Sequence, residues 1–224
     1  MFRKIIAQRR RTDKFYHNTV NLFLILLAML LIQSTLLLAE INPKLAVEQI
    51  TFGEQHHFFG YIGQSKTIPW NASGRYIVAM RSNFHDHMPA PHEAADIILL
   101  DTQNNYSVKK IDETRGWNFQ QGTMMYWNPA APEMQFFFND RDTETNQIYT
   151  VLFDIEKNRR VQEYKYPGMS LANSGVAQNG GSFLAINYGR LSRLRPVTGY
   201  PDALDQTKGV LAPEDDGIFI IDVK

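Results

Sequence analysis

A strand–turn–strand pattern that recurs about every fifty residues constrains this sequence more than any other feature. In its middle copy, residues 117–122 (WNFQQG) lead through two aromatic residues and an Asn-Pro turn into the apolar run 134–138, which favours a strand. Two further copies, at residues 68–80 and 176–187, also lead from a polar turn into an apolar run. Such spacing indicates a repeat protein.

Short predicted strands fill each copy, and no segment after residue 39 shows convincing helical periodicity. The strands cover 75–81, 96–101 and 107–111 in the first repeat, 134–139, 147–155 and 160–166 in the second, and 182–187 and 217–223 in the third. Four short antiparallel strands in a unit of about fifty residues are typical of a β-propeller blade. We therefore predict an all-β fold: an incomplete β-propeller of about three four-stranded blades, the last without its final strand, after an N-terminal transmembrane or signal helix.

Composition narrows the possible chemistry. With 224 residues, 44% of them hydrophobic, the chain is long and apolar enough to bury a core. It contains no cysteine, which excludes disulfides, thiolate metal sites and a cysteine nucleophile. The first fourteen residues carry a net charge of +5, so the rest carries −5. An acidic body argues against nucleic acid as a partner.

The N-terminal region predicts a membrane attachment. Residues 1–19 are basic and should stay in the cytoplasm, and residues 20–39 are almost wholly apolar and long enough to span a bilayer. A linker at 40–54 then leads to the propeller domain at 55–224, which should lie outside the cytoplasmic membrane.

Two forms of this attachment are open. We favour an uncleaved single-pass anchor in the cytoplasmic membrane, because Leu37 stands where a signal peptidase prefers a small residue. The alternative is a cleaved signal peptide, which would export a body that begins at Glu40.

Several motifs point to one family. They are HFFGY at 57–61, PWN and GRY within 69–76, ETRGWNFQQG at 113–122, WNP and FNDRD within 127–142, and APEDDGIFIIDV at 212–223. Together they resemble bacterial propeller proteins related to the oligogalacturonate lyases and, more distantly, to the TolB-like propellers. The resemblance covers nearly everything after residue 55. It implies a six- or seven-bladed propeller that acts on acidic polysaccharide or belongs to a pathway for it.

The chain departs from this family in length. Residues 55–224 hold about three blades, whereas closed propellers have roughly four to eight. In oligogalacturonate lyases the histidine-rich metal site and the catalytic histidine lie in later blades, so the resemblance assigns no catalytic residue here. No cofactor is evident, although the resemblance implies a divalent metal in a full-length relative. We expect a truncated product or an open half-propeller whose exposed edge needs the remaining blades or self-association.

One polar group is the strongest candidate for ligand binding: Arg115, Trp117, Asn118, Gln120, Gln121 and Arg141. The innermost strands of a propeller line its channel, where polar side chains beside a tryptophan can hold a sugar. Arg141, between Asp140 and Asp142, suits a uronate carboxylate. Alternatively, the group closes the seam between blades, and Asp140 and Arg141 form a structural pair in a turn.

The histidines and a late arginine cluster are weaker candidates. His85, His87 and His92, with Glu93, offer ligands for zinc or manganese, but we favour a polar loop and predict no metal site. The adjacent His56 and His57 are either ligands or a packed, hydrogen-bonded pair. Finally, three arginines lie before Pro196 and either attract uronate or form a solvated loop: Arg190, Arg193 and Arg195.

Three classes of function follow. The first is an oligogalacturonate lyase-like enzyme or its inactive remnant, which requires a base and a metal or arginine in one cleft. The second is a membrane-anchored scaffold that binds acidic carbohydrate or a protein partner outside the cytoplasm. The third is a gene fragment with no function of its own. We favour the scaffold, with the lyase as the alternative.

Overall fold

The computed structural model describes residues 45–60 and 69–224. The chain divides into two compact units, 1–49 and 50–224, and the second contains all the strands described below. The segment 20–39, predicted to enter the membrane, lies outside the described residues. Within the described ranges, no helix has the length and apolar character needed to cross a bilayer.

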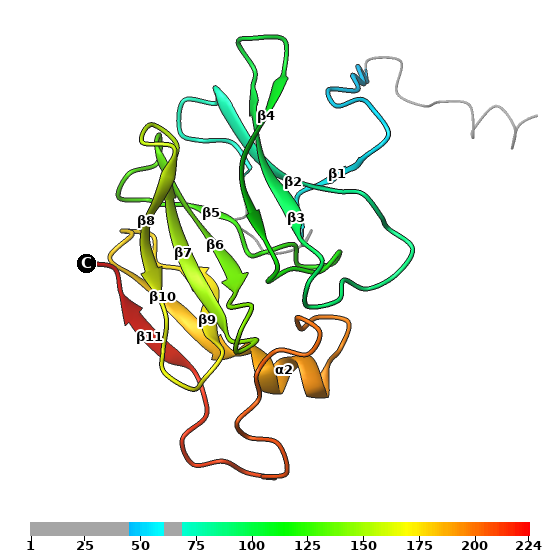
Figure 1. Ribbon diagram of the computed structural model, residues 1–224. Helices are drawn as coiled ribbons and strands as arrows, with labels where there is room; N and C mark the ends of the chain where they lie inside the picture. Colours follow the sequence, from blue (N-terminus) through cyan, green and yellow to red (C-terminus); the bar gives the residue numbers. More distant parts are fainter. Residues whose placement is uncertain (1–44, 61–68) are drawn as a thin grey trace, which may run out of the picture. The chain divides into compact units, whose positions relative to one another are not determined.

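The body is all-β and is built from three antiparallel sheets, each a meander of consecutive strands (Figure 1). The first sheet contains β1 (His56–Phe58), β2 (Tyr76–Ser82), β3 (Ala95–Asp101) and β4 (Ser107–Thr114). The second contains β5 (Tyr126–Trp127), β6 (Gln135–Arg141), β7 (Ile148–Asp154) and β8 (Arg159–Tyr164). The third contains β9 (Leu171–Val176), β10 (Ser182–Asn187) and β11 (Phe219–Asp222). The predicted all-β class is confirmed, and each predicted strand overlaps an observed one.

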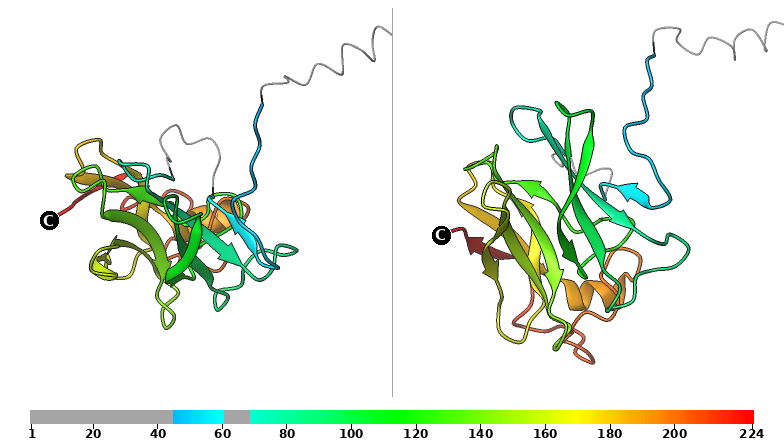
Figure 2. Two further views of the ribbon diagram at one scale, coloured as in Figure 1. Left: turned by 90° about the horizontal axis from the view of Figure 1, so that it is seen from above. Right: turned by 45° about the horizontal axis from the view of Figure 1, so that its top comes forward.

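The second sheet lies between the other two (Figure 1, Figure 2). Side chains alternate between the two faces of a strand, and both faces of β6 are aromatic. Phe136 and Phe138 join the core shared with the first sheet, whereas Phe137 joins the core shared with the third. All three side chains are fully buried, so β6 stabilises both seams.

One segment departs from the strand pattern. Between β10 and β11 lies an insertion, residues 188–218, which begins with the short helix α2 (Tyr188–Leu194). The side chain of Asn187 caps α2 by accepting a hydrogen bond from the Arg190 backbone N–H. The sequence predicted no helix here, because seven residues are too few to reveal a helical period.

The insertion supplies a core of its own. The rings of Tyr188 and Tyr200 stack at 4.6 Å, and both are fully buried with Met124, Ile148 and Ala172. These last three residues belong to the second and third sheets or precede them directly, so the first part of the insertion is packed onto the strand ends. Residues 208–218, in contrast, are largely exposed.

Candidate functional site

The predicted ligand group is centred on the loop 117–122, which connects the first sheet to the second. We predicted that these residues lie on an innermost strand, but in the structure they form a loop just before β5. Asn118 and Gly122 exchange two backbone hydrogen bonds. The Oδ1 atom of Asn118 also accepts from the backbone N–H groups of Gln120 and Gln121. The loop is therefore a closed turn held by its own asparagine.

Glycine allows this turn to approach the segment after β1. Gly60 has a φ of 93°, and a Cβ atom there would lie 2.5 Å from the backbone oxygen of Gln121. Gly122 has a φ of 60°, and its Cβ would lie 2.8 Å from the Cα of Gly60. The HFFGY and WNFQQG motifs thus meet backbone to backbone, and each needs its glycine.

Trp117 is a core residue in this structure. Its side chain is fully buried, and its Nε1–H donates to the backbone oxygen of Glu93 at 2.9 Å. Its ring lies against Phe58, Phe84 and Phe119, with centroids 5.0 to 5.7 Å apart. Aromatic neighbours therefore occupy the surroundings in which a sugar would stack.

Asn118 and Arg141 hold the insertion against the seam. The Asn118 Nδ2 atom donates to the backbone oxygen of Gly199 at 2.8 Å. Arg141 is 3% exposed; its Nη2 donates to the Pro201 oxygen at 2.6 Å and its Nε to the Arg115 oxygen at 3.1 Å. Burial lowers the pKa of Arg141 to about 10, although the negative charges of Asp202 and Asp140 act to raise it. These contacts match the alternative that the group closes a seam.

Two buried polar atoms of the group keep unused hydrogen-bonding capacity. Within the described residues, neither Arg141 Nη1 nor Gln121 Oε1 has a hydrogen-bond partner, and both are shielded from solvent. Buried polar atoms are nearly always paired with protein or water. One donor and one acceptor are thus available here to water or to a small polar ligand.

The two remaining members of the group point outward. Gln120 is exposed, and the half-buried Arg115 forms an ion pair with Glu113 at 2.9 Å. The structure thus joins two of the six residues, Asn118 and Arg141, to the insertion, buries Trp117 in the core, and leaves Gln120 and Arg115 at the surface. Ligand binding by this group stays a prediction.

Asp140 is the centre of a charged cluster between the first two sheets. Its Oδ1 accepts from the Arg115 backbone N–H at 2.9 Å, and its Oδ2 lies 2.8 Å from Arg160 Nη1. Arg160 also forms a two-pronged pair with Asp112 on β4, at 2.8 and 3.1 Å. Burial lowers the pKa of Arg160, but Asp112 and Asp140 more than offset it, so the net pKa is raised. Asp140 pairs with Arg160 rather than with the adjacent Arg141 side chain. No pattern in the sequence indicated that Arg160 would be its partner.

Asp142 forms a structural turn. Its Oδ1 accepts hydrogen bonds from the backbone N–H groups of Glu144 and Thr145 and from the Thr145 hydroxyl. These bonds lower the pKa of the Asp142 carboxyl and close the connection from β6 to β7.

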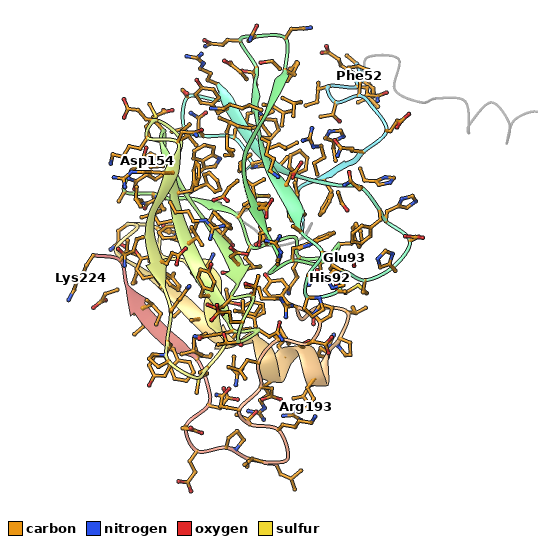
Figure 3. All side chains as sticks on the ribbon, in the orientation of Figure 1. Phe52, His92, Glu93, Asp154, Arg193 and Lys224 are labelled. Carbon is orange, nitrogen blue, oxygen red and sulfur yellow. The ribbon has the colours of Figure 1, made fainter. Side chains whose placement is uncertain are left out.

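The structure separates the histidines that the sequence grouped. His87 stacks on Phe84, and its two ring nitrogens face Asp86 at 2.8 Å and Glu93 at 3.2 Å. These hydrogen bonds, that with Asp86 first, raise the pKa of His87. His92 is exposed on the same loop, beside Glu93 (Figure 3).

His56 and His85 come together instead. The Nδ1 atom of His85 lies 2.7 Å from Nε2 of His56. His57 follows on β1, where burial and the charge of Arg81 lower its pKa. Across residues 45–60 and 69–224, no three potential metal-binding side chains of histidine, cysteine or acidic type gather at one point.

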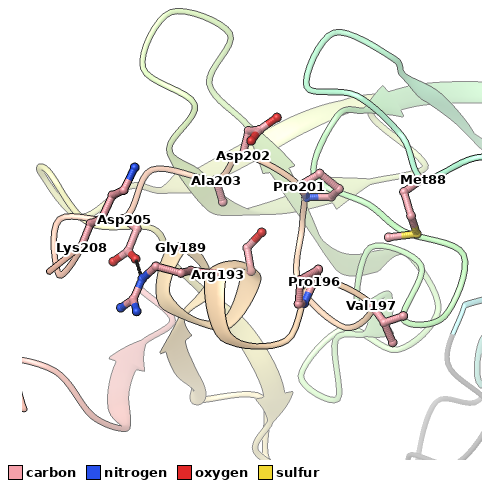
Figure 4. Close-up of a pocket in the computed structure, with 11 residues that line it drawn as sticks. Met88, Gly189, Arg193, Pro196, Val197, Pro201, Asp202, Ala203, Asp205 and Lys208 are labelled. Atoms are coloured by element: carbon pink, nitrogen blue, oxygen red, sulfur yellow. Dashed lines mark hydrogen bonds and ion pairs between the residues drawn. The ribbon is translucent and has the colours of Figure 1, made fainter. Parts of the chain in front are cut away.

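The insertion also forms a pocket of about 560 Å³, which Met88 from the β2–β3 loop helps to line (Figure 4). At one end the Arg193 Nε atom forms an ion pair with Asp205 at 2.5 Å. Arg190 pairs with Asp216 at 2.6 Å, so these two arginines fix the insertion internally, while Arg195 is exposed.

Comparison of the sequence with known protein families finds no matching family, and comparison with curated proteins finds no matching protein. The resemblance to the oligogalacturonate lyase-related propellers therefore stays a prediction.

Proposed function

We propose that this chain is a β-propeller-type binding scaffold, anchored in the cytoplasmic membrane by residues 20–39, and that its third sheet docks a protein partner outside the cytoplasm. Three consecutive antiparallel meanders, stacked face to face, support the propeller assignment. The basic start and the apolar segment that follows support the location.

The observation that carries the proposal is an apolar face on the third sheet. Leu184 on β10 and Ile220 on β11 lie opposite each other in the register, so they share a face. They are 48% and 70% exposed, and Ile218 beside them is 77% exposed. On the other face, Phe183 and Ala185 are buried against the second sheet. Apolar residues on both faces are typical of a sheet that is covered by another layer of structure on each side.

A partner of β-sheet type fits this surface best. Burying an isoleucine or leucine side chain contributes roughly 1.5 to 3 kcal/mol, so covering this face is strongly favourable. Among the described strands, β11 pairs only with β10, so its other edge offers backbone groups to a further strand. Ser182 and Asp222 form a pair at one end of this face, but its centre at Leu184 and Ile220 is aliphatic, which favours a protein.

Site-specific photo-crosslinking in intact cells tests the proposal. A photoreactive residue at position 220 should give a discrete protein adduct in the membrane fraction, because Ile220 would lie in the interface. The matched control is Val108 on β4, which is also partly exposed at 39% but belongs to the first sheet. A Leu184→Lys substitution should abolish the adduct. Equal labelling at both positions, or none at 220, would contradict the proposal.

An acidic oligosaccharide is a second candidate, favoured by the two buried unpaired atoms of Gln121, in the loop 117–122, and Arg141, at the end of β6. Arg141 Nη1 can donate to a uronate oxygen, and Gln121 Oε1 can accept from a hydroxyl. Uronate oligomers should then bind the wild type more weakly as salt rises.

The variant Gln121→Met removes the acceptor, whereas Gln120→Met changes its exposed neighbour as a control. Losing the Gln121 hydrogen bond should weaken binding by roughly 0.5 to 1.5 kcal/mol. Arg141→Ala should weaken it by roughly 1.5 to 3 kcal/mol, the range for a charged hydrogen bond. Calorimetric titration that detects no binding by the wild type would exclude this candidate.

A further inference from the structure

Two histidine side chains from distant parts of the sequence face each other at the surface. His56 belongs to β1, and His85 lies on the loop between β2 and β3. Besides the 2.7 Å between Nε2 and Nδ1, their ring centroids are 3.9 Å apart and the ring planes are tilted by 56°. Two ring nitrogens at this separation share a hydrogen bond, so one is protonated and the other offers its lone pair.

We propose that His56 and His85 form a two-histidine binding site for a divalent transition-metal ion of the kind that prefers imidazole, such as Cu²⁺ or Zn²⁺. Water molecules complete the coordination shell. The site differs from the grouping of His85, His87 and His92, because its second ligand comes from β1.

The geometry needs a small adjustment to accept an ion. Zinc bound at about 2.0 to 2.1 Å from each nitrogen, with tetrahedral angles, holds the two nitrogens roughly 3.3 Å apart. The pair must therefore open by roughly half an ångström. His85 is exposed on a loop, so its ring can move by this amount without disturbing the core.

No net proton has to be released from the neutral pair. The ring that donates the shared hydrogen bond changes tautomer, so its proton moves to the other ring nitrogen and a second lone pair becomes available. Asp86 follows His85 directly and adds negative charge beside the site, which favours a cation.

The other described histidines lack this arrangement. Both nitrogens of His87 face carboxylates on opposite sides of the ring, so no single ion reaches both acids. His57 is the next residue on β1, and neighbouring side chains of a strand point to opposite faces. The site therefore depends on one nitrogen from each of two residues.

Metal binding would have a structural consequence. β1 pairs with β2 through only three residues, so it is weakly held by backbone contacts. An ion shared by His56 and His85 would fasten β1 to the β2–β3 loop. A ligand that binds only the folded state stabilises that state, so the ion should raise the melting temperature.

The test titrates the full chain, in detergent micelles, with CuCl₂, ZnCl₂ and MgCl₂. We expect one Cu²⁺ or Zn²⁺ per chain, with Cu²⁺ bound more tightly, and no binding of Mg²⁺, which prefers oxygen ligands. Electron paramagnetic resonance of the Cu²⁺ form should show hyperfine coupling to two nitrogens. Thermal unfolding should shift upward with Zn²⁺.

The variants His56→Gln and His85→Gln should each weaken binding by roughly tenfold or more and remove the thermal shift. His92→Gln is the matched control on the same loop, and His17→Gln controls for the N-terminal region. Both controls should bind as the wild type does. Unfolding curves without metal verify that all four variants fold. Binding that survives in His56→Gln or His85→Gln, disappears in a control, or is absent from the wild type would overturn the proposal.

Discussion

The two seams of this protein are built on opposite faces of one strand, β6, yet they hold their polar groups differently. Toward the first sheet, β6 presents Phe136, Phe138 and then Asp140, whose carboxylate binds Arg160. Toward the third sheet it presents Phe137 and then Asn139, whose amide donates to the Asn173 oxygen at 3.0 Å. The apolar parts are alike. Next to them, one seam has a charged cluster and the other a neutral amide network, and the buried Arg141 follows only at the end of that second face.

This difference has a thermodynamic meaning. Buried ion pairs lose much of their attraction to desolvation, and removing one partner leaves the other charged and buried. The network of Asn139, Thr150 and Asn173 is neutral, so removing one of its members leaves no buried charge unpaired. The first seam should therefore respond to changes of charge, and the second mainly to the loss of single hydrogen bonds.

The largest effects should come from the aromatic residues that the seams share. Phe136→Ala and Phe137→Ala each remove a fully buried ring, and each should lower the free energy of unfolding by roughly 3 to 5 kcal/mol. Urea denaturation followed by tryptophan fluorescence measures both. Leu184→Ala, on an exposed face, is the control and should cost far less. A small effect at only one of the two phenylalanines would show that its seam is loosely packed.

Exchanging the polar groups of the two seams sharpens the comparison. Asp140→Asn leaves Arg160 without one of its buried partners and should cost roughly 3 kcal/mol. Asn139→Asp places a new carboxylate in the neutral network, where burial raises the pKa of that group. Its destabilisation should therefore shrink as the pH falls. Denaturation at several pH values would measure this change. A destabilisation of Asn139→Asp that does not vary with pH would contradict the prediction.

Single hydroxyl groups of the second seam should matter less. Tyr200→Phe removes the oxygen that accepts from Asn139 Nδ2 at 3.2 Å, at a cost of about 1 kcal/mol. Tyr188→Phe removes a donor to the Asn173 oxygen and should cost a similar amount. Tyr166→Phe, at an exposed position, should change the unfolding free energy very little. A larger loss at Tyr166 than at Tyr200 would be inconsistent with the described network.

The smallest expected effect lies outside both seams, at His87. Asp86 and Glu93 raise its pKa above the usual 6.5, so its charged form stabilises the β2–β3 loop. This stabilisation is complete below the unfolded pKa and is lost as the pH rises through the higher folded value. Melting temperatures of the wild type and His87→Gln should therefore converge as the pH rises above the unfolded pKa of about 6.5. A difference in melting temperature that grows as the pH rises would contradict this prediction.

The strands were predictable because their apolar residues follow a local rule. The run at 134–138 already indicated β6, and its alternating phenylalanines mark both faces of the sheet. The insertion was not predictable in this way. Tyr188 and Tyr200 stack across a helix and a loop, and no periodic pattern joins them.

The candidate site shows the same limit. Trp117 suggested a sugar platform, but Phe58 and Phe84 cover it, and both come from elsewhere in the chain. Likewise, Asp140 pairs with Arg160 from β8 instead of its sequence neighbour. Partners that meet only after the sheets stack leave no local signal, and His56 with His85 is another example.

The position of β6 and β7 also predicts an order of folding. These strands pair along seven consecutive residues, and Asp142 fixes the short turn between them, so the hairpin can form from local contacts alone. The first sheet packs on one face of the second sheet, to which this hairpin belongs, and the third sheet packs on the other. We expect this hairpin to be the folding nucleus, so that substitutions at Phe138 slow refolding, whereas substitutions in β1 mainly accelerate unfolding. The first and third sheets would then add independently, each in its own kinetic step.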